Sequence, residues 1–137
     1  MALCYKEELQ EAINYYQCGH FQEASFSFEK LIKNYSNKPE SYYYLAKIES
    51  EFYKNIKKAI ELMSKAVDIT PFYEAYKELT QYSIAEKDLP SVLKHAKQTL
   101  TYNSQCEQTL SVLKNLFPKE IHFIRDKETV INRDHAV

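Results

Sequence analysis

A thiol and an imidazole lie two residues apart at Cys18 and His20, with the only glycine of the chain, Gly19, between them. Thiolate sulfur and imidazole nitrogen are both zinc ligands, so the pair raises the question of a metal site. A structural zinc site needs four ligands, and no C-x₂-C or H-x₃-H pair accompanies these two residues. The sequence therefore predicts no metal site, and it favours a turn cysteine followed by a surface histidine.

Nucleophilic and phosphate-binding chemistry has little support either. The motifs GxGxxG, GxSxG and GxxxxGK need two or more glycines, and this chain has one. A cysteine–histidine dyad formed by tertiary proximity stays open, because the chain has three cysteines and four histidines. No neighbouring stretch supplies an oxyanion hole or an orienting acid for such a dyad. We expect no enzyme activity, no catalytic residue and no cofactor.

The charge balance does not favour nucleic acid or a membrane as the partner. Among 137 residues, 18 are Lys or Arg and 19 are Asp or Glu, which gives a formal net charge of −1. No basic run alternates with aromatic residues as in a nucleic-acid groove. No apolar run approaches the roughly 20 residues that span a bilayer. The expected partner is a protein or peptide.

The compartment is inferred from the N-terminus and the cysteines. The opening residues MALCYKEELQ contain no basic region followed by an apolar stretch, so no signal peptide is predicted. Cys4, Cys18 and Cys106 are odd in number and scattered, which suits a reducing compartment better than a disulfide framework. We expect a cytoplasmic protein.

Composition indicates an all-helical fold. The chain is 45% hydrophobic and 27% charged, as in ordinary soluble globular proteins. It has one glycine and four prolines, too few for a β-rich fold with many tight turns.

The sequence repeats itself with a period of about 34 residues. The stretch KKAIELMSKAVDITP at residues 57–71 is echoed by EASFSFEKLIKNYS at residues 23–36. A second amphipathic segment precedes each of these, with Ala12 and Ala46 at matching positions. The corresponding residues of the three successive units are Ala24, Phe28 and Leu31, then Ala59, Met63 and Ala66, then Val92, Ala96 and Thr99.

This pattern resembles the tetratricopeptide repeat, a 34-residue helix–turn–helix unit. The resemblance depends on small residues where backbones approach closely, a large residue at the middle of the second helix, and Pro71 at the end of the second unit. The small and large residues are Ala12, Ala24, Ala46, Ala59 and Ala66, and Phe28 and Met63. The family implies a short α-solenoid; the alternative is an unrelated helical bundle with accidental periodicity.

The resemblance covers residues 5–104, with a further first helix at 105–116. It predicts one repeat domain, residues 1–117, with units at 5–38, 39–72 and 73–104, a polar-backed capping helix at 105–117 and a tail at 118–137. The third unit departs from the pattern: Thr80 or Gln81 stands where a small apolar residue is usual, and Val92 replaces alanine. We interpret the tail as partly disordered, with docked apolar residues or short strands as alternatives.

Helix boundaries follow from the turn residues. Pro39 suits a first helical position, Asp88 an N-cap, and Gly19 a left-handed residue after a helix. The predicted helices lie near 4–18, 22–35, 39–53, 56–69, 72–86, 90–102 and 105–117.

In tetratricopeptide proteins the first helices of the units line a concave groove that takes an extended peptide or a partner helix. Carried over position by position, the resemblance predicts groove residues on three helices, with Thr109 and Leu113 of the capping helix as further candidates. The groove residues are Lys6, Leu9, Ile13, Tyr16, Glu40, Tyr43, Lys47, Glu51, Glu78, Tyr82 and Glu86.

One subclass of the family binds acidic C-terminal tails of heat-shock chaperones with a clamp of lysine, asparagine and arginine. The clamp positions read Leu9, Ile13, Tyr44, Ala75 and Leu79, so this activity is not expected. The groove set instead combines apolar and aromatic residues with carboxylates, which suits an apolar or aromatic peptide carrying basic groups. A core role for some of its tyrosines is the competing interpretation.

The sequence therefore favours a non-enzymatic adaptor or assembly factor that holds a protein partner. Two alternatives stay open: a chaperone dedicated to one client, and a self-associating module in which a second copy covers the imperfect third unit as a homodimer.

Overall fold

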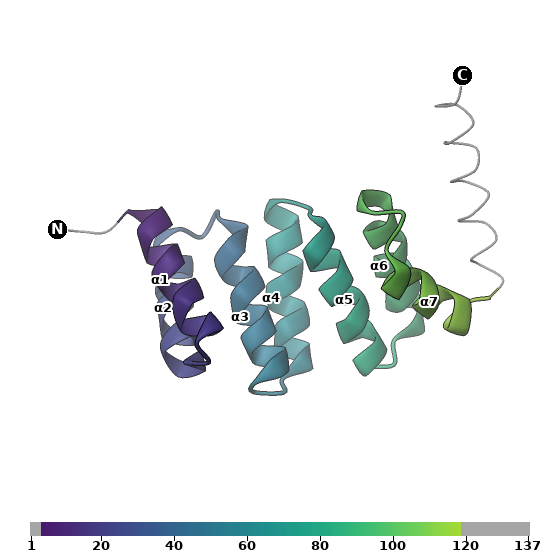
Figure 1. The fold of residues 1–137 in the computed structure, drawn as a ribbon, viewed down its shortest axis with the longest axis horizontal. Helices are drawn as coiled ribbons and strands as arrows, with labels where there is room; N and C mark the ends of the chain where they lie inside the picture. The colour runs from purple at the N-terminus through teal and green to yellow at the C-terminus, as the bar shows by residue number, and fades with distance from the viewer. Residues whose placement is uncertain (1–3, 119–137) are drawn as a thin grey trace, which may run out of the picture. The chain divides into compact units, whose positions relative to one another are not determined.

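The computed structural model describes residues 4–118, and within them it contains α-helices and no strand (Figure 1). The predictions for residues 119–137 lie outside this range. Each helix begins and ends within two residues of its predicted range, so the all-α prediction is confirmed. The helices are α1 (Tyr5–Gln17), α2 (Phe21–Asn34), α3 (Pro39–Glu51), α4 (Ile56–Ile69), α5 (Tyr73–Ala85), α6 (Leu89–Tyr102) and α7 (Glu107–Leu116).

The turn after α1 is the one place where glycine is needed. Gly19 has φ of 81°, a left-handed conformation that glycine adopts without steric cost. Its N–H donates to the Tyr16 carbonyl at 3.1 Å, and the His20 N–H donates to the Tyr15 carbonyl at 2.9 Å. These bonds satisfy carbonyls at the end of α1. Cys18 and His20 are both exposed in this turn.

Capping residues explain where other helices begin. Pro39 is the first residue of α3, where its missing N–H is not needed. Asp88 caps α6, because its carboxylate accepts the Ser91 backbone N–H at 3.4 Å and the Ser91 hydroxyl at 2.7 Å. The turns before α4 and α6 each contain a lysine with positive φ, Lys54 at 59° and Lys87 at 58°.

The chain divides into two compact units, with the boundary between Ala75 and Tyr76 near the start of α5. The first unit contains two helical hairpins, α1–α2 and α3–α4. Within it α2 packs against α3, and α1 also contacts α3. In Figure 1, α1 and α3 lie on the nearer side, with α2 and α4 behind them.

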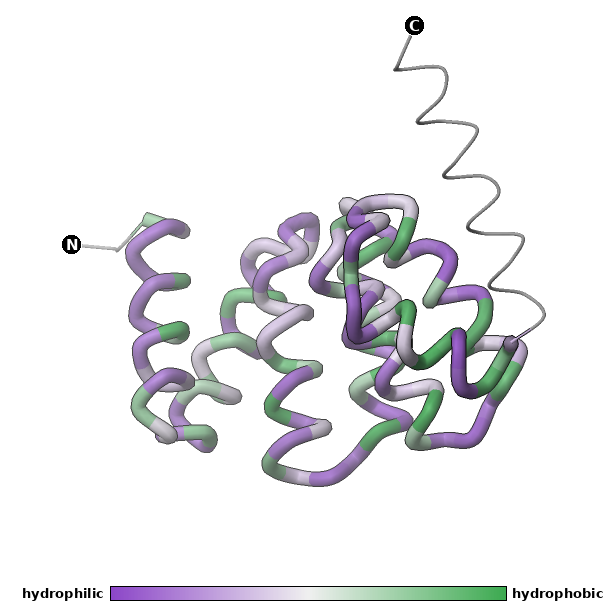
Figure 2. Tube along the Cα trace, turned by 45° about the vertical axis from the view of Figure 1, so that its right-hand side comes forward, coloured by the Kyte–Doolittle hydropathy of each residue, from purple (hydrophilic) through white to green (hydrophobic). Residues whose placement is uncertain are grey.

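The core of the first unit combines the smallest and the largest apolar residues. Ala12, Ala24 and Ala46 are fully buried, as are Phe28 and Met63. Small residues allow the helix backbones to approach, and large ones fill the space between them. Figure 2 shows hydrophobic and hydrophilic residues alternating along the helices, which leaves one side of each helix for the core.

The second unit contains α5 from Tyr76 onward, α6 and α7, and it accommodates the residues that depart from the repeat pattern. Val92 and Thr99 are fully buried, and Thr80 is 1% exposed. The Thr80 hydroxyl donates to the Tyr76 carbonyl at 2.9 Å and lies 3.3 Å from the Thr99 hydroxyl. The Thr99 hydroxyl donates to the His95 carbonyl at 2.8 Å, so each buried hydroxyl has an acceptor on its own helix. Polar residues at these core positions therefore need not disrupt the unit.

In α7 the polar side is exposed, as the sequence indicates, but the two groove candidates on this helix are buried. Gln108, Ser111 and Lys114 are exposed. Thr109 and Leu113, the further groove candidates, are 1% and 0% exposed. These two side chains belong to the core of the second unit and are not available to a partner.

His95 on α6 is expected to make the second unit less stable in acid. Burial lowers the pKa of His95 below its ordinary value of about 6.5, although a hydrogen bond between Nδ1 and the Gln98 side chain at 3.0 Å opposes the shift. The folded state therefore binds fewer protons than the unfolded state, and stability is lost as pH falls from above 6.5 through the folded pKa. Urea unfolding at pH 7.5 and pH 5.5 should show a larger loss for the native protein than for His95→Gln. Equal losses in the two proteins would assign the acid sensitivity to other groups.

Candidate functional site

Two tyrosine–glutamate pairs join α1 to α3. The Tyr5 hydroxyl donates to Glu40 Oε2 at 2.8 Å, and the Tyr16 hydroxyl donates to Glu51 Oε2 at 3.0 Å. Each pair spans 35 residues, about one repeat. Eleven residues separate the two partners on each helix, which is about three turns and keeps them on one side. We call the surface formed by Tyr16, Tyr43, Lys47 and Glu51 with these pairs the α1/α3 face.

Lys47 lies between two tyrosine rings at the middle of this face. Its Nζ is 5.8 Å from the centre of the Tyr16 ring and 5.6 Å from that of Tyr43. Glu51 Oε1 is 4.0 Å from the same nitrogen. At the two ring distances a cation is attracted to the aromatic faces. Four predicted groove residues, Tyr16, Tyr43, Lys47 and Glu51, are thus brought together.

Tyr44 connects the α1/α3 face to the core. Its ring stacks on Phe28 at 5.4 Å with an interplanar angle of 4°. The same ring contacts Tyr16 at 5.5 Å and Tyr43 at 5.2 Å. Phe28 is fully buried and holds the Tyr44 ring in place. Tyr16 and Tyr43 therefore pack against a ring that is itself anchored in the core.

The aromatic contacts extend in a second direction, toward the turn after α3. Tyr16 contacts Phe21 at 5.9 Å, and Phe21 contacts Phe52 at 5.0 Å. Phe52 and Tyr53 are each 46% exposed. The first unit therefore presents exposed aromatic surface that is continuous with its core.

A hollow of about 390 Å³ lies beside Tyr43. It lies where the start of α3 meets the turn after α4, and Tyr43 contacts Phe72 there at 5.5 Å. Aromatic rings and carboxylates suit a lysine or arginine side chain, through cation–π contact and charged hydrogen bonds. The lining residues are Pro39, Glu40, Tyr43, Tyr44, Thr70, Phe72 and Glu74.

Tyr5 acts as a hydrogen-bond donor at the edge of the hollow. Burial, the hydrogen bond to Glu40 and the charge of that carboxylate all raise the pKa of Tyr5 well above its ordinary value. The hydroxyl is protonated at neutral pH, as an ordinary tyrosine also is, and the raised pKa extends this hydrogen bond to Glu40 further into the alkaline range.

The other predicted groove residues have varied surroundings. On α1, Lys6 is exposed, and Leu9 and Ile13 are half-buried. Glu78 and Tyr82 on α5 and Glu86 just after it belong to the second unit. Tyr82 is only 4% exposed, which corresponds to the core role that the sequence left open for such tyrosines.

Sequence reasoning did not identify Tyr5, Phe72 or Glu74 as candidate site residues. A signal existed for Tyr5, because Tyr5–Glu40 and Tyr16–Glu51 repeat one residue pair at the same separation. Phe72 and Glu74 follow Pro71 at the junction of two helices, where no periodic pattern marks a surface position.

Metal binding and membrane insertion find no support in the described part of the chain. Among residues 4–118, no group of three or more His, Cys, Asp or Glu side chains converges in a way that could hold a metal ion. In that same range, every helix is too short or too polar to cross a membrane.

No protein-family model matches the sequence, and no curated protein is a match. Solved structures do match. The first TPR of Spaghetti (RPAP3), bound to the HSP90 peptide SRMEEVD, has a TM-score of 0.75 and 16% identity, covering 82% of this chain and 89% of that one. The Yersinia enterocolitica type III secretion chaperone SycD, in complex with a peptide of the translocator YopD, has a TM-score of 0.68 and 12% identity, covering 90% and 93%.

A third solved structure gives the same result. The TPR2B domain of yeast Sti1, in its pHsp70 complex, has a TM-score of 0.67 and 18% identity, and the match covers 90% of this chain and 97% of that domain. At these identities the likeness concerns the fold. Together with the repeat of about 34 residues and the buried alanines at matching positions, it establishes that the chain has the tetratricopeptide-repeat fold.

Proposed function

We propose that the protein is a non-enzymatic adaptor or assembly factor, and that the α1/α3 face with its hollow binds a peptide or helix of a partner protein. The observation that carries this proposal is the set of tyrosine rings around the hollow, supported from below by Phe28 through Tyr44. Tyrosine offers a large rigid contact area with a polar tip and is enriched among residues that dominate binding. The three solved structures described above are each in complex with a peptide or an Hsp70 partner, which supports a binding role for this fold.

The chemistry of the hollow favours a partner with aromatic or apolar residues and at least one basic side chain. Glu40 and Glu74 give the hollow two carboxylates, and Tyr43 and Phe72 provide ring surface. Lys47 already lies against Tyr16 and Tyr43, which is an example within the chain of the contact that we expect a partner's cation to make. An acidic peptide would place its carboxylates beside those of Glu40 and Glu74, at an unfavourable electrostatic cost.

Selection from a random peptide library tests the proposal. Enriched peptides should combine aromatic residues with Lys or Arg, and Tyr43→Ala should weaken their binding by about tenfold or more, since aromatic anchors typically contribute at least that much. Glu40→Gln with Glu74→Gln should remove the preference for basic over neutral peptides, because the amides keep the shape and lose the charge.

The matched control is Tyr102→Ala. Tyr102 is an exposed tyrosine on α6, 53% accessible, and it does not line the hollow. Circular dichroism should show the helical signal retained in each variant. Enrichment of acidic peptides, or equal binding by the native protein and Tyr43→Ala, would contradict the proposal.

A further inference from the structure

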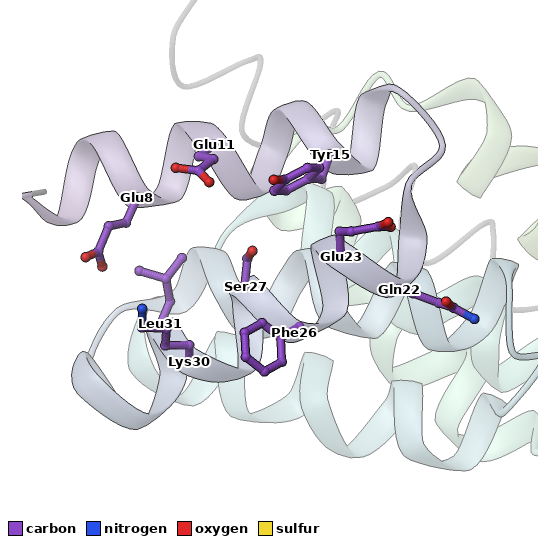
Figure 3. A pocket seen from close by; sticks show the side chains of 9 residues that line it. All are labelled: Glu8, Glu11, Tyr15, Gln22, Glu23, Phe26, Ser27, Lys30 and Leu31. Carbon is purple, nitrogen blue, oxygen red and sulfur yellow. The ribbon is translucent and has the colours of Figure 1, made fainter.

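A second cavity lies on the first hairpin and shares no lining residue with the hollow or the α1/α3 face. Its volume is about 610 Å³, and its lining comes only from α1 and α2 (Figure 3). The side chains used below are Glu8, Glu11 and Tyr15 from α1 and Glu23, Phe26 and Lys30 from α2. We call this surface the outer face of the first hairpin.

Phe26 is an exposed aromatic residue in the middle of this face. Its side chain is 72% exposed, more than any other large hydrophobic residue in the part of the chain that the structure describes. Glu23 and Lys30 precede and follow it by three and four residues, so charged side chains flank the ring on the same side of α2 (Figure 3). A well-exposed aromatic ring with a polar surround is the typical anchor of a protein–protein contact.

The second hairpin shows what normally lies on this face. One repeat later, the positions of Glu8, Glu11 and Ser27 are taken by Tyr42, Leu45 and Leu62, at steps of 34, 34 and 35 residues. These three are only 8%, 2% and 9% exposed, and the first hairpin packs against α3 beside them. Among residues 4–118, the same side of a hairpin is therefore covered by helices in one case and open in the other. The covered case indicates that a helix can occupy this side.

The charges indicate which kind of helix. Where the second hairpin has apolar Tyr42 and Leu45, the outer face has Glu8 and Glu11. Glu8, Glu11 and Glu23 are opposed by Lys30 among the lining residues, an excess of two negative charges. Glu23 also lies 4.0 Å from His20 Nδ1, which does not line the cavity. Covering the face with an apolar or acidic helix would bury these carboxylates with too few positive partners, which is strongly unfavourable.

We propose that the outer face is a docking surface for a basic amphipathic helix of a partner protein. The apolar stripe of that helix covers Phe26 and Tyr15, and its flanking Lys or Arg side chains pair with Glu8, Glu11 and Glu23. This is recognition of a helix by a groove, with ion pairs that set orientation and association rate. It is independent of peptide binding at the α1/α3 face.

Two synthetic helical probes test the proposal by fluorescence anisotropy with the full chain. One probe carries leucines at helical spacing with lysines on the other positions; the second has glutamates in place of the lysines. The lysine probe should bind, more weakly as salt is raised, and the glutamate probe should not. Equal binding of both probes would overturn the proposal.

Variants locate the binding. Phe26→Ser and, separately, Glu8→Lys with Glu11→Lys should each lower affinity for the lysine probe by about tenfold or more. The matched control is Phe52→Ser, a phenylalanine that is 46% exposed and does not line this cavity. Neither that change nor Tyr43→Ala should alter binding of the probe. Unchanged binding by Phe26→Ser would refute the assignment to this face, whatever the result at the hollow.

A second copy of the chain is the competing occupant. Light scattering across a concentration series should give the mass of one chain for the native protein and for Phe26→Ser alike. A native dimer that Phe26→Ser converts to monomer, without binding of the lysine probe, would assign the face to self-association and overturn the proposal.

Discussion

Replacing Phe28 by alanine is expected to lower the free energy of unfolding by about 3–5 kcal/mol, the cost typical of removing a fully buried phenyl ring. Phe28 is 0% exposed and lies at the middle of α2. The change leaves a cavity between the helices and removes the stack with Tyr44 at 5.4 Å, worth about 0.5–1.5 kcal/mol beyond area alone. Small proteins are stable by only about 5–15 kcal/mol, so a large share would be lost.

The matched control lies two residues earlier on the same helix. Phe26 is 72% exposed, and Phe26→Ala should change stability by no more than about 0.5 kcal/mol. Urea unfolding followed by circular dichroism measures both, and the thermal midpoint of Phe28→Ala should fall by roughly 10 °C or more. Comparable losses in the two variants would mean that the inward side of α2 has been assigned wrongly.

The effect of Phe28→Ala on function should follow from the same contact. Without the stacked ring beneath it, Tyr44 has no fixed support, and Tyr16 and Tyr43 both contact Tyr44. Binding at the α1/α3 face is therefore expected to weaken even at temperatures where the variant is folded. Phe28→Leu removes less volume than Phe28→Ala, so it should retain more of the stability and more of the binding.

The helices were predictable because their signals are local and redundant. Gly19 in a left-handed turn, Pro39 at a first helical position and Asp88 as an N-cap each mark a boundary by residue type alone. The alanines at matching positions mark the packing interface in the same way. The polar residues at core positions of the third unit could be recognised from the sequence as departures from the repeat pattern. Thr80 and Thr99 each donate to a carbonyl of their own helix, but the approach of the two hydroxyls to 3.3 Å is a contact between helices that spacing does not reveal.

The site was only partly predictable, because it depends on which side chains meet in three dimensions. Tyr16, Tyr43, Lys47 and Glu51 were identified from their repeat positions, and they do meet. Phe72 was not, since a residue after a helix-ending proline has no periodicity to place it. Tyr82 corresponds to the core alternative that the sequence left open: it stands at a predicted groove position, and its large ring is buried in the second unit. Tyrosine is amphipathic, so its residue type does not decide between core and surface.

Enlarging a buried alanine is expected to destabilise the protein as well, although less than removing the buried ring does. Ala46 is 0% exposed on α3, the helix that packs against α1, α2 and α4. Ala46→Leu adds three carbon atoms at a point of close helix approach, and overpacking of this kind typically costs about 1–3 kcal/mol. Its intrinsic helix propensity hardly changes, so a loss would reflect packing.

Ala85→Leu is the matched control for this prediction, because Ala85 is the exposed last residue of α5. It should unfold within about 0.5 kcal/mol of the native protein. Urea titrations of both variants decide the point. If Ala46→Leu were as stable as Ala85→Leu, α3 would have room for a large side chain at position 46. The buried alanines at matching repeat positions would then no longer explain how the hairpins of the first unit pack together. A selective loss at Ala46 would mean that the residue size at this position, beyond its apolar character, sets the spacing of the helices that carry Tyr16 and Tyr43.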